Sequence, residues 1–183
     1  MQQFDCTLRG EHYTFKTKPG LFSHTKLDKG TELLVNIMEI RLGDVVLDLG
    51  CGCGVIGIVA AHLARNGKVS MVDTDVRAIK YSKINAELNG ITNVEIKASD
   101  GFEELDNMQF DVILSNPPNH SPKDTFVEFF EGAKKHLKKN GKLFFVTENR
   151  LKPMVKRELE RIFGNFEKVA SNSEYIIGYS ENK

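Results

Sequence analysis

"VLDLGCGCGVIG", residues 46–57, decides the fold, because it leads from an apolar strand into a helix through closely spaced glycines. Glycine allows sharp backbone turns and close approach to a ligand, and doubly wound sheets bind ligands at the carboxyl ends of their strands. The stretch therefore predicts a ligand-binding turn after the first strand of an α/β sheet. Its residues of interest are Asp48, Gly50, Gly52, Gly54 and Gly57.

Outward from this stretch, the chain alternates short apolar runs rich in β-formers with longer segments of helical period. The expected parallel strands are residues 45–49, 68–73, 93–98, 110–115 and 141–147. This alternation is typical of a parallel sheet with helices on both faces. The C-terminal runs "NFEKVAS" and "EYIIGYS" predict a hairpin. The expected fold class is therefore α/β: a doubly wound, Rossmann-like, mostly parallel seven-stranded sheet with an antiparallel edge strand.

The chain has 183 residues, 40% of them apolar, which suits a single domain over residues 1–183. Residues 1–20 are expected to form an N-terminal β-hairpin appended to it. The hydrophobic pattern also predicts helices over 31–40 and 152–163, and a third with its apolar stripe from Phe126 to Leu137.

The charges balance, with 25 Lys and Arg residues against 25 Asp and Glu residues. No global field attracts nucleic acid, so an RNA-binding surface would have to be a local patch. The "KKHLKK" run, residues 134–139, is interpreted mainly as a solvated helix end, with nucleic-acid contact as the less favoured alternative.

The three cysteines and five histidines have neither disulfide-framework nor metal-ligand spacing, so we expect no metal site. The N-terminus lacks an apolar signal core, and no run is long enough to span a membrane. These features predict a soluble cytoplasmic protein with no membrane partner.

Three acidic residues mark three successive strand ends: Asp48, Asp73 and Asp100. Asp48, inside its strand, could organise the amides of the glycine loop and face a cationic ligand group. Asp73 is placed to accept both ribose hydroxyls of an adenosine. Asp100 could accept a hydrogen bond from an adenine amino group, or it could simply cap the next helix. Together they favour S-adenosylmethionine, a cation that carries an adenosine.

The competing nucleotide classes are less well supported. From Gly52 onward the loop also satisfies GxGxxG, so the motif alone cannot exclude a dehydrogenase. A Tyr-x-x-x-Lys pair occurs only at Tyr179 and Lys183, and GxxxxGK[ST] is missing, which disfavours a dehydrogenase and a phosphate-cradling ATPase.

The fourth strand ends in "NPP", residues 116–118, which alone is ordinary turn punctuation. At this edge of the sheet it can hold a substrate amine. The Asn116 side-chain oxygen and the Pro117 carbonyl could accept the two N–H bonds and aim the nitrogen lone pair at the methyl group. Proline fixes the backbone torsions and removes competing donors.

Residues 17–179 resemble the class I S-adenosylmethionine-dependent methyltransferases. Within that class they are most similar to the catalytic domain of the ribosomal RNA guanine-N2 methyltransferases of the small-subunit methyltransferase C type. The stretches that carry the resemblance are "PGLFS" (19–23), "LDKGTELL" (27–34), "VLDLGCGCGV" (46–55) and "SNPPNH" (115–120).

The resemblance implies a role for each part of the site. Gly50, Cys51 and Gly52 would cradle the methionine part of the cofactor, Asp73 the ribose and Asp100 the adenine. Phe22 and Asp28 would lie over the cofactor. The target amine would be held by Asn116, Pro117 and Pro118, and the substrate would be RNA, most readily ribosomal RNA.

One departure from the family leaves alternatives open. Asn119 stands where an aromatic residue commonly supplies a stacking platform for the base. Adenine N6 and a protein glutamine amide are alternative acceptors, and because enzymes for these also usually have an aromatic residue at this place, the departure weakens all three assignments alike. A further alternative is an accessory subunit that binds the cofactor without catalysis, against which the intact Asp73 and "NPP" argue.

Overall fold

The computed structural model describes residues 2–21, 27–118 and 123–183. A seven-stranded sheet runs through its centre in the order β5-β4-β3-β6-β7-β9-β8. The first five of these pair in parallel, and β9 and β8 add an antiparallel edge. The strands are β3 Val45–Leu49, β4 Lys68–Asp73, β5 Val94–Ala98, β6 Phe110–Ser115, β7 Leu137–Glu148, β8 Glu167–Ser171 and β9 Tyr175–Asn182. The expected fold class is confirmed.

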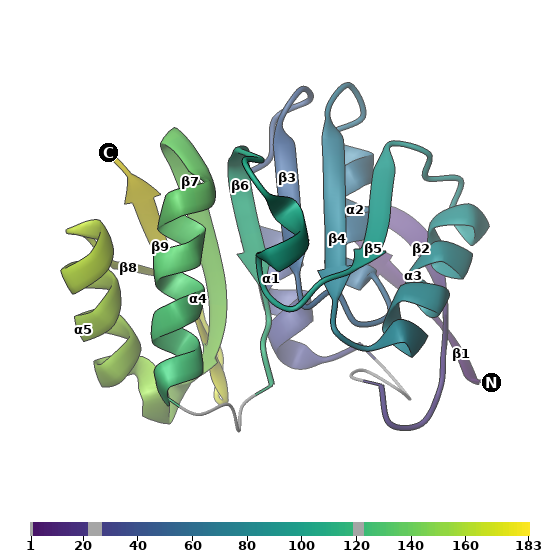
Figure 1. Ribbon diagram of the computed structural model, residues 1–183. Coiled ribbons are helices and arrows are strands. Elements are labelled where there is room, and N and C mark those ends of the chain that lie inside the picture. Colours follow the sequence, from purple (N-terminus) through teal and green to yellow (C-terminus); the bar gives the residue numbers. More distant parts are fainter. Residues whose placement is uncertain (1, 22–26, 119–122) are drawn as a thin grey trace.

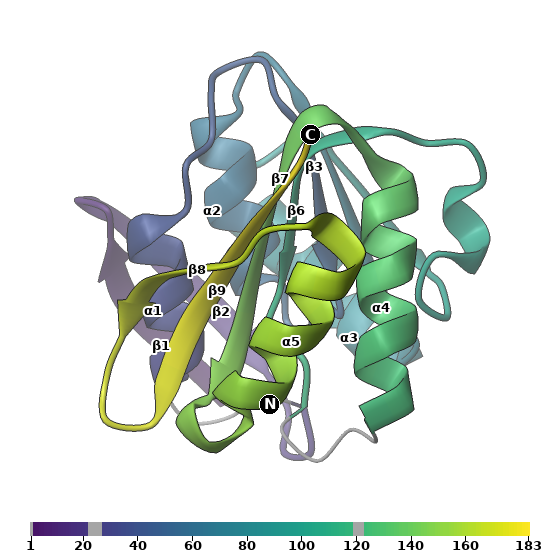
Figure 2. The same ribbon diagram turned by 90° about the vertical axis from the view of Figure 1, so that its left-hand side faces the viewer.

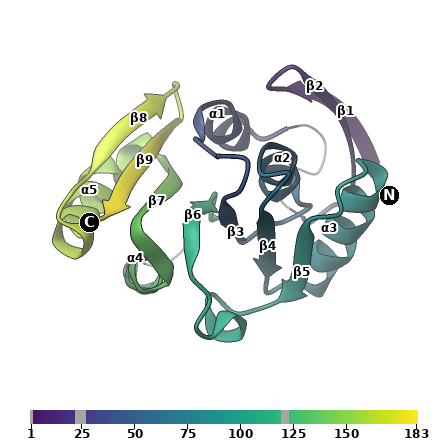
Figure 3. The ribbon, with the colours of Figure 1, turned by 90° about the horizontal axis from the view of Figure 1, so that it is seen from above.

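Helices cover both faces of this sheet, each over its own apolar cluster (Figure 3). One face carries α1 Lys29–Ile37, α2 Val55–Leu63 and α3 Val76–Leu88; the other carries α4 Lys123–His136 and α5 Lys152–Phe163, with the short 3₁₀ helices η1 Glu103–Leu105 and η2 Asn149–Leu151. Because each helix returns the chain to the next parallel strand, the carboxyl ends of β3, β4, β5 and β6 meet at one edge of the sheet (Figure 1).

The predicted N-terminal hairpin is present as β1 Gln2–Leu8 and β2 Glu11–Thr17, paired antiparallel. It is a separate two-stranded sheet beside α3. Tyr13 and Phe15 are buried and belong to the same apolar cluster as α1 and α2. The hairpin is therefore packed into the core rather than attached only by its connecting chain.

Several element boundaries differ from the sequence expectation, among them the start of α1 and the end of α4. Helix α1 begins at Lys29 rather than 31, because the Asp28 side chain caps it by accepting the Thr31 N–H at 2.8 Å. Helix α4 ends at His136, so Leu137 is buried as expected but pairs with Phe110 as part of β7. The predicted helical stripe therefore extended one residue too far.

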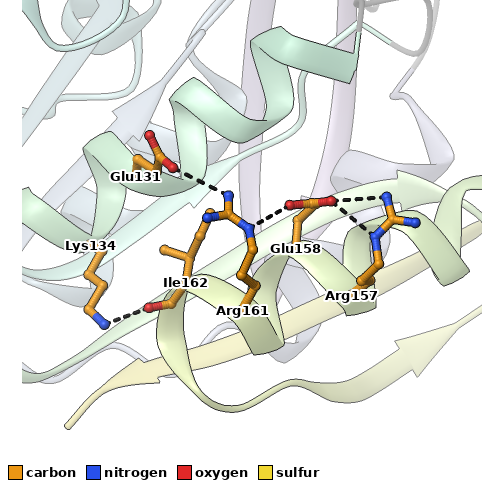
Figure 4. A network of polar contacts seen from close by, with 6 residues as sticks. All are labelled: Glu131, Lys134, Arg157, Glu158, Arg161 and Ile162. Carbon is orange, nitrogen blue, oxygen red and sulfur yellow. Dashed lines mark hydrogen bonds and ion pairs between the residues drawn. The ribbon is translucent and has the colours of Figure 1, made fainter.

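Charged residues join α4 to α5, which lie side by side in Figure 2. In Figure 4, Glu158 lies between Arg157 and Arg161, and Arg161 also reaches Glu131 on α4. Hydrogen bonds from Arg161 and then Arg157 lower the pKa of Glu158. Lys134 donates to the Ile162 carbonyl, and it lies at the α4 end that is away from the carboxyl edge of the sheet. This part of "KKHLKK" thus stabilises helix packing.

Candidate functional site

A cavity of about 890 Å³ opens at the carboxyl edge of the sheet. Its walls come from residues 20–21, the glycine loop, the ends of β4, β5 and β6, and one side of α4. We call it the main cavity. Its volume lies within the range of small-molecule sites.

The structure brings most of the predicted site residues to this cavity. Asp28 and Asp48 do not line it, and Phe22, like Asn119, lies outside the described residues. The predicted residues that line it are Gly50, Cys51, Gly52, Asp73, Asp100, Asn116, Pro117 and Pro118.

The glycine loop is pinned to the next strand and turns in a conformation suited to glycine. The N–H groups of Gly50 and Cys51 both donate to the Val72 carbonyl at 2.9 Å. Gly50 and Gly52 have φ angles of 74° and 56°, and a Cβ on either would meet nothing within 4 Å. The loop therefore presents bare backbone to open space, as a ligand cradle requires.

Asp73 is held rigidly at the end of β4. Its Oδ2 accepts the Gly52 N–H and its Oδ1 accepts the Asp75 N–H, both at 2.9 Å. Each carboxylate oxygen has a further lone pair, so both can also accept from hydroxyl groups of a ligand. Asp73 thus joins the glycine loop to the wall expected to hold a ribose.

Asp100 is an exposed residue at the end of β5. The amide of Glu104 donates to Ser99 Oγ at 3.1 Å, and η1 has no side-chain cap within the described segment 99–106. The Asp100 carboxylate therefore does not cap η1, although the Asp100 backbone carbonyl accepts the Glu103 N–H at 3.1 Å. Asp100 is one of the residues that line the main cavity.

Asp48 is bonded to the helix that follows the glycine loop. It is fully buried, and its Oδ2 accepts the Gly57 N–H of α2 at 2.8 Å. No hydrogen-bond donor of the described residues reaches its Oδ1. Burial raises the pKa of Asp48 from 3.8 to about 7, against the opposing effect of the Gly57 hydrogen bond.

This raised pKa predicts a dependence of stability on pH. The folded chain holds the Asp48 proton more tightly than the unfolded chain, so this group makes the protein less stable as pH rises from about 4 to about 7. The variant Asp48→Asn cannot ionise and should gain stability relative to the wild type on going from about pH 5 to about pH 8. Urea unfolding at both pH values measures this. If the free energies of unfolding of Asp48→Asn and the wild type differ by the same amount at both pH values, the raised pKa of Asp48 is contradicted.

Asn116 has a fixed orientation at the end of β6. Its Nδ2 donates to Asp28 Oδ2 at 2.8 Å and to Thr31 Oγ1 at 2.9 Å. Because a carboxylate only accepts, the amide nitrogen must face Asp28, which leaves Oδ1 on the other side. That oxygen is buried and has no hydrogen-bond partner among residues 2–21, 27–118 and 123–183. A buried acceptor without a partner in a cavity wall is suited to an N–H donor of a ligand.

Asp28 therefore has a different place from the one the resemblance implied. It caps α1 and orients Asn116, and it does not line the main cavity. Gly30 leaves room for this contact, since a Cβ there would lie 3.1 Å from Asp28 Oδ2 and 2.8 Å from Val146 Cγ1. The contact between Thr31 and Asn116 was not predicted from the sequence. The available signal was the three-residue spacing of Asp28 and Thr31, which is typical of an N-cap.

The α4 wall of the cavity was also missed. The Phe102 ring stacks on His136 with a centroid distance of 4.7 Å and an interplanar angle of 15°. Gly132 makes this possible, because a Cβ there would lie 2.5 Å from the Phe102 ring. No local sequence pattern signals this contact, which joins segments 30 or more residues apart.

No helix of the described residues is both long and apolar enough for a membrane span. Across the same residues, no group of three or more His, Cys, Asp or Glu side chains has the arrangement of a metal site.

Comparison with known proteins supports a common family. Residues 12–179 match the family model of the methyltransferase small domain. The chain is 36% identical over 179 residues to uncharacterized protein YbxB of Bacillus subtilis (strain 168), across 96% of this chain and 89% of that protein. It is 36% identical over 168 residues to ribosomal RNA small subunit methyltransferase C of Haemophilus influenzae (strain 86-028NP), across 90% of this chain and 50% of that relative.

A solved structure gives the same picture. The chain resembles a T. thermophilus 16S rRNA guanine-N2 methyltransferase, solved in complex with AdoMet and guanosine, with a TM-score of 0.89 and 29% identity. The match covers 100% of this chain and 50% of that one. The chain thus spans about half the length of the methyltransferase C relatives.

Proposed function

The chain belongs to the methyltransferase small domain family and takes its methyl group from S-adenosylmethionine, and we propose that it transfers this group to N2 of guanine in ribosomal RNA. The observation that carries the proposal is the Asn116 carboxamide, whose nitrogen is held by Asp28 and Thr31 and whose buried Oδ1 lacks a partner within the described chain.

The main cavity fits this cofactor. We assign the open backbone of Gly50, Cys51 and Gly52 to the methionine part, because the two glycines have no side chain and the space beside their backbone is empty. We assign the free lone pairs of Asp73 to the ribose hydroxyls, and Asp100 to the adenine amino group. When bound, the cofactor supplies an electrophilic methyl group on a positively charged sulfur.

The chain's own part in the reaction is to position the amine. The lone pair of an exocyclic amine is delocalised into the base, so the nitrogen is a weak nucleophile. Asn116 Oδ1 and the Pro117 carbonyl accept its two N–H bonds, which orients the lone pair and favours the positive charge that develops on nitrogen. The hydrogen bonds that Asn116 donates to Asp28 and Thr31 polarise the amide and strengthen Oδ1 as an acceptor. The amine can lose its proton after attack, so no general base is needed.

The acceptor and its RNA are inferred from the relatives. The relatives named above include ribosomal RNA small subunit methyltransferase C and a guanine-N2 methyltransferase solved with guanosine. An exocyclic amine with two N–H bonds is the group that the Asn116 and Pro117 acceptors would complement. We place this reaction in the cytoplasm, with RNA as the macromolecular partner.

Identification of the methylated nucleoside tests this proposal. The protein is incubated with methyl-labelled S-adenosylmethionine and total RNA from cells that lack its gene, and the RNA is digested to nucleosides. We expect the label in N2-methylguanosine. Label in N6-methyladenosine would show that the acceptor is adenine and not guanine. Label found only in protein added to a parallel reaction would show that the substrate is protein and not RNA.

A further inference from the structure

Helix α3 and its C-cap residue carry three polar side chains, one turn apart, that connect the glycine loop to the N-terminal hairpin. They are Ser82, Asn85 and Asn89, in the segment "SKINAELN". Ser82 and Asn85 are both fully buried. None of the three lines the main cavity, so any effect on a ligand must pass through the backbone that they hold.

Two of these side chains fix consecutive carbonyl groups of the glycine loop. Ser82 Oγ donates to the Gly52 carbonyl at 2.9 Å, and Asn85 Nδ2 donates to the Cys53 carbonyl at 2.8 Å. Because the C=O and N–H of a trans peptide point in opposite directions, these bonds direct the following N–H groups away from α3. They hold the loop carbonyls on the helix side, where they cannot rotate toward the ligand side.

The two asparagines also pair with the free edge of the hairpin. Asn85 accepts the Lys16 N–H and donates to the Lys16 carbonyl, both at 2.8 Å. Asn89 accepts the Thr14 N–H at 3.1 Å and donates to the Thr14 carbonyl at 2.9 Å. Two strand residues span about 6.8 Å and four helical residues rise about 6 Å, so the two amides match the spacing of a neighbouring strand.

Asn85 is the only one of the three that bonds both segments. Its two N–H donors are divided between the carbonyls of Lys16 and Cys53, so one side chain joins β2 to the loop after β3. Four residues beyond Lys16 the chain enters the wall of the main cavity at Gly20. The same amide therefore bonds the glycine loop, which lines the cavity, and the strand that leads to Gly20 in the cavity wall.

We propose that Ser82 and Asn85 are positioning residues for the cofactor loop, and that Asn85 couples the N-terminal hairpin to it. This inference rests on the proposed assignment of Gly50 to Gly52 to the cofactor. Loss of either side chain frees a carbonyl that the loop geometry requires to be fixed, so cofactor affinity falls although no ligand contact is removed.

The three positions separate this role from general stability. Ser82→Ala removes a bond to the loop only, and Asn85→Ala removes bonds to the loop and to the hairpin. Asn89→Ala removes the hairpin bonds and a bond to the Asn85 carbonyl, but none to the loop. Calorimetric titration with S-adenosylmethionine is performed at a temperature at which circular dichroism shows every variant to be folded. We expect Ser82→Ala and Asn85→Ala to raise Kd by about 3- to 10-fold, as loss of one hydrogen bond implies, and Asn89→Ala by less than about 2-fold.

The kinetic counterpart is a rise in the KM for the cofactor with kcat largely retained. Wild-type affinity in both Ser82→Ala and Asn85→Ala overturns the proposal, as does an equal loss in Asn89→Ala. If Asn85→Ala does not fold, the Kd values of Ser82→Ala and Asn89→Ala are compared with each other, and a weaker Kd in Ser82→Ala alone supports the positioning role. The variant Asp73→Ala distinguishes failure of this inference from failure of the proposed cofactor site. If only Asp73→Ala loses affinity, the cofactor site stands and the positioning role of Ser82 and Asn85 is wrong. If Asp73→Ala also binds with wild-type affinity, the assignment of the loop to the cofactor fails.

Discussion

Asn116→Ala is expected to lose most of its methyl transfer activity while the protein still binds S-adenosylmethionine within a few-fold of the wild-type Kd. The substitution removes the Oδ1 acceptor that holds the amine, and loss of one such preorganised group typically lowers kcat by about 100- to 1,000-fold. Single-turnover transfer of labelled methyl to RNA measures the first quantity, and calorimetry measures the second.

Thr31→Val is the matched control for this prediction. It keeps Asn116 Oδ1 but removes one of the two acceptors that orient the amide, the contact of 2.9 Å to Nδ2. Its loss of kcat should be clearly smaller than that of Asn116→Ala. Retained activity in Asn116→Ala, or loss of cofactor binding in parallel with activity, would contradict a role for Asn116 in holding the amine.

Asp73→Ala should have the second largest effect, on cofactor affinity. Its two oxygens are already anchored by the Gly52 and Asp75 amides and are proposed to accept two ribose hydroxyls. Hydrogen bonds to a charged group contribute about 1.5–3 kcal/mol, so Kd should rise by about 10- to 150-fold. Calorimetric titration with S-adenosylmethionine measures the change.

Glu95→Ala serves as the control for charge. It removes one carboxylate from the neighbouring strand β5, where Glu95 pairs with Lys68 and does not line the main cavity. We expect its Kd to match the wild type. An unchanged Kd in Asp73→Ala would remove that residue from the cofactor site.

The sheet and the carboxyl edge that carries the candidate site could be predicted because local sequence patterns determine them. Strands 45–49, 68–73 and 110–115 match the expected bounds, since each is a short apolar run closed by a polar or glycine turn. In parallel α/β sheets such turns meet at one edge, which placed Asp73, Asp100 and Asn116 around one cavity.

Contacts between distant segments could not be predicted in this way. Asp28 and Asn116 lie 88 positions apart, and Asn85 is 69 positions from Lys16. Local propensity contains no information on such pairs, so the contact by which Asp28 orients Asn116 was not predicted. The α4 boundary failed for a related reason: Leu137 suits a helical stripe, but its pairing with Phe110 in the sheet decides its conformation.

The central claim, that Asn116 Oδ1 receives the exocyclic amine, is tested most directly by comparing guanosine with inosine, which lacks the 2-amino group. Binding of each nucleoside is measured by calorimetry with S-adenosylhomocysteine present, for the wild type and for Asn116→Ala. We predict that the wild type binds guanosine at least about tenfold more tightly, because a site built for an N–H donor rejects an analogue without it, and that Asn116→Ala loses this preference. Equal affinity of the wild type for the two nucleosides, or a preference that survives in Asn116→Ala, would contradict the claim.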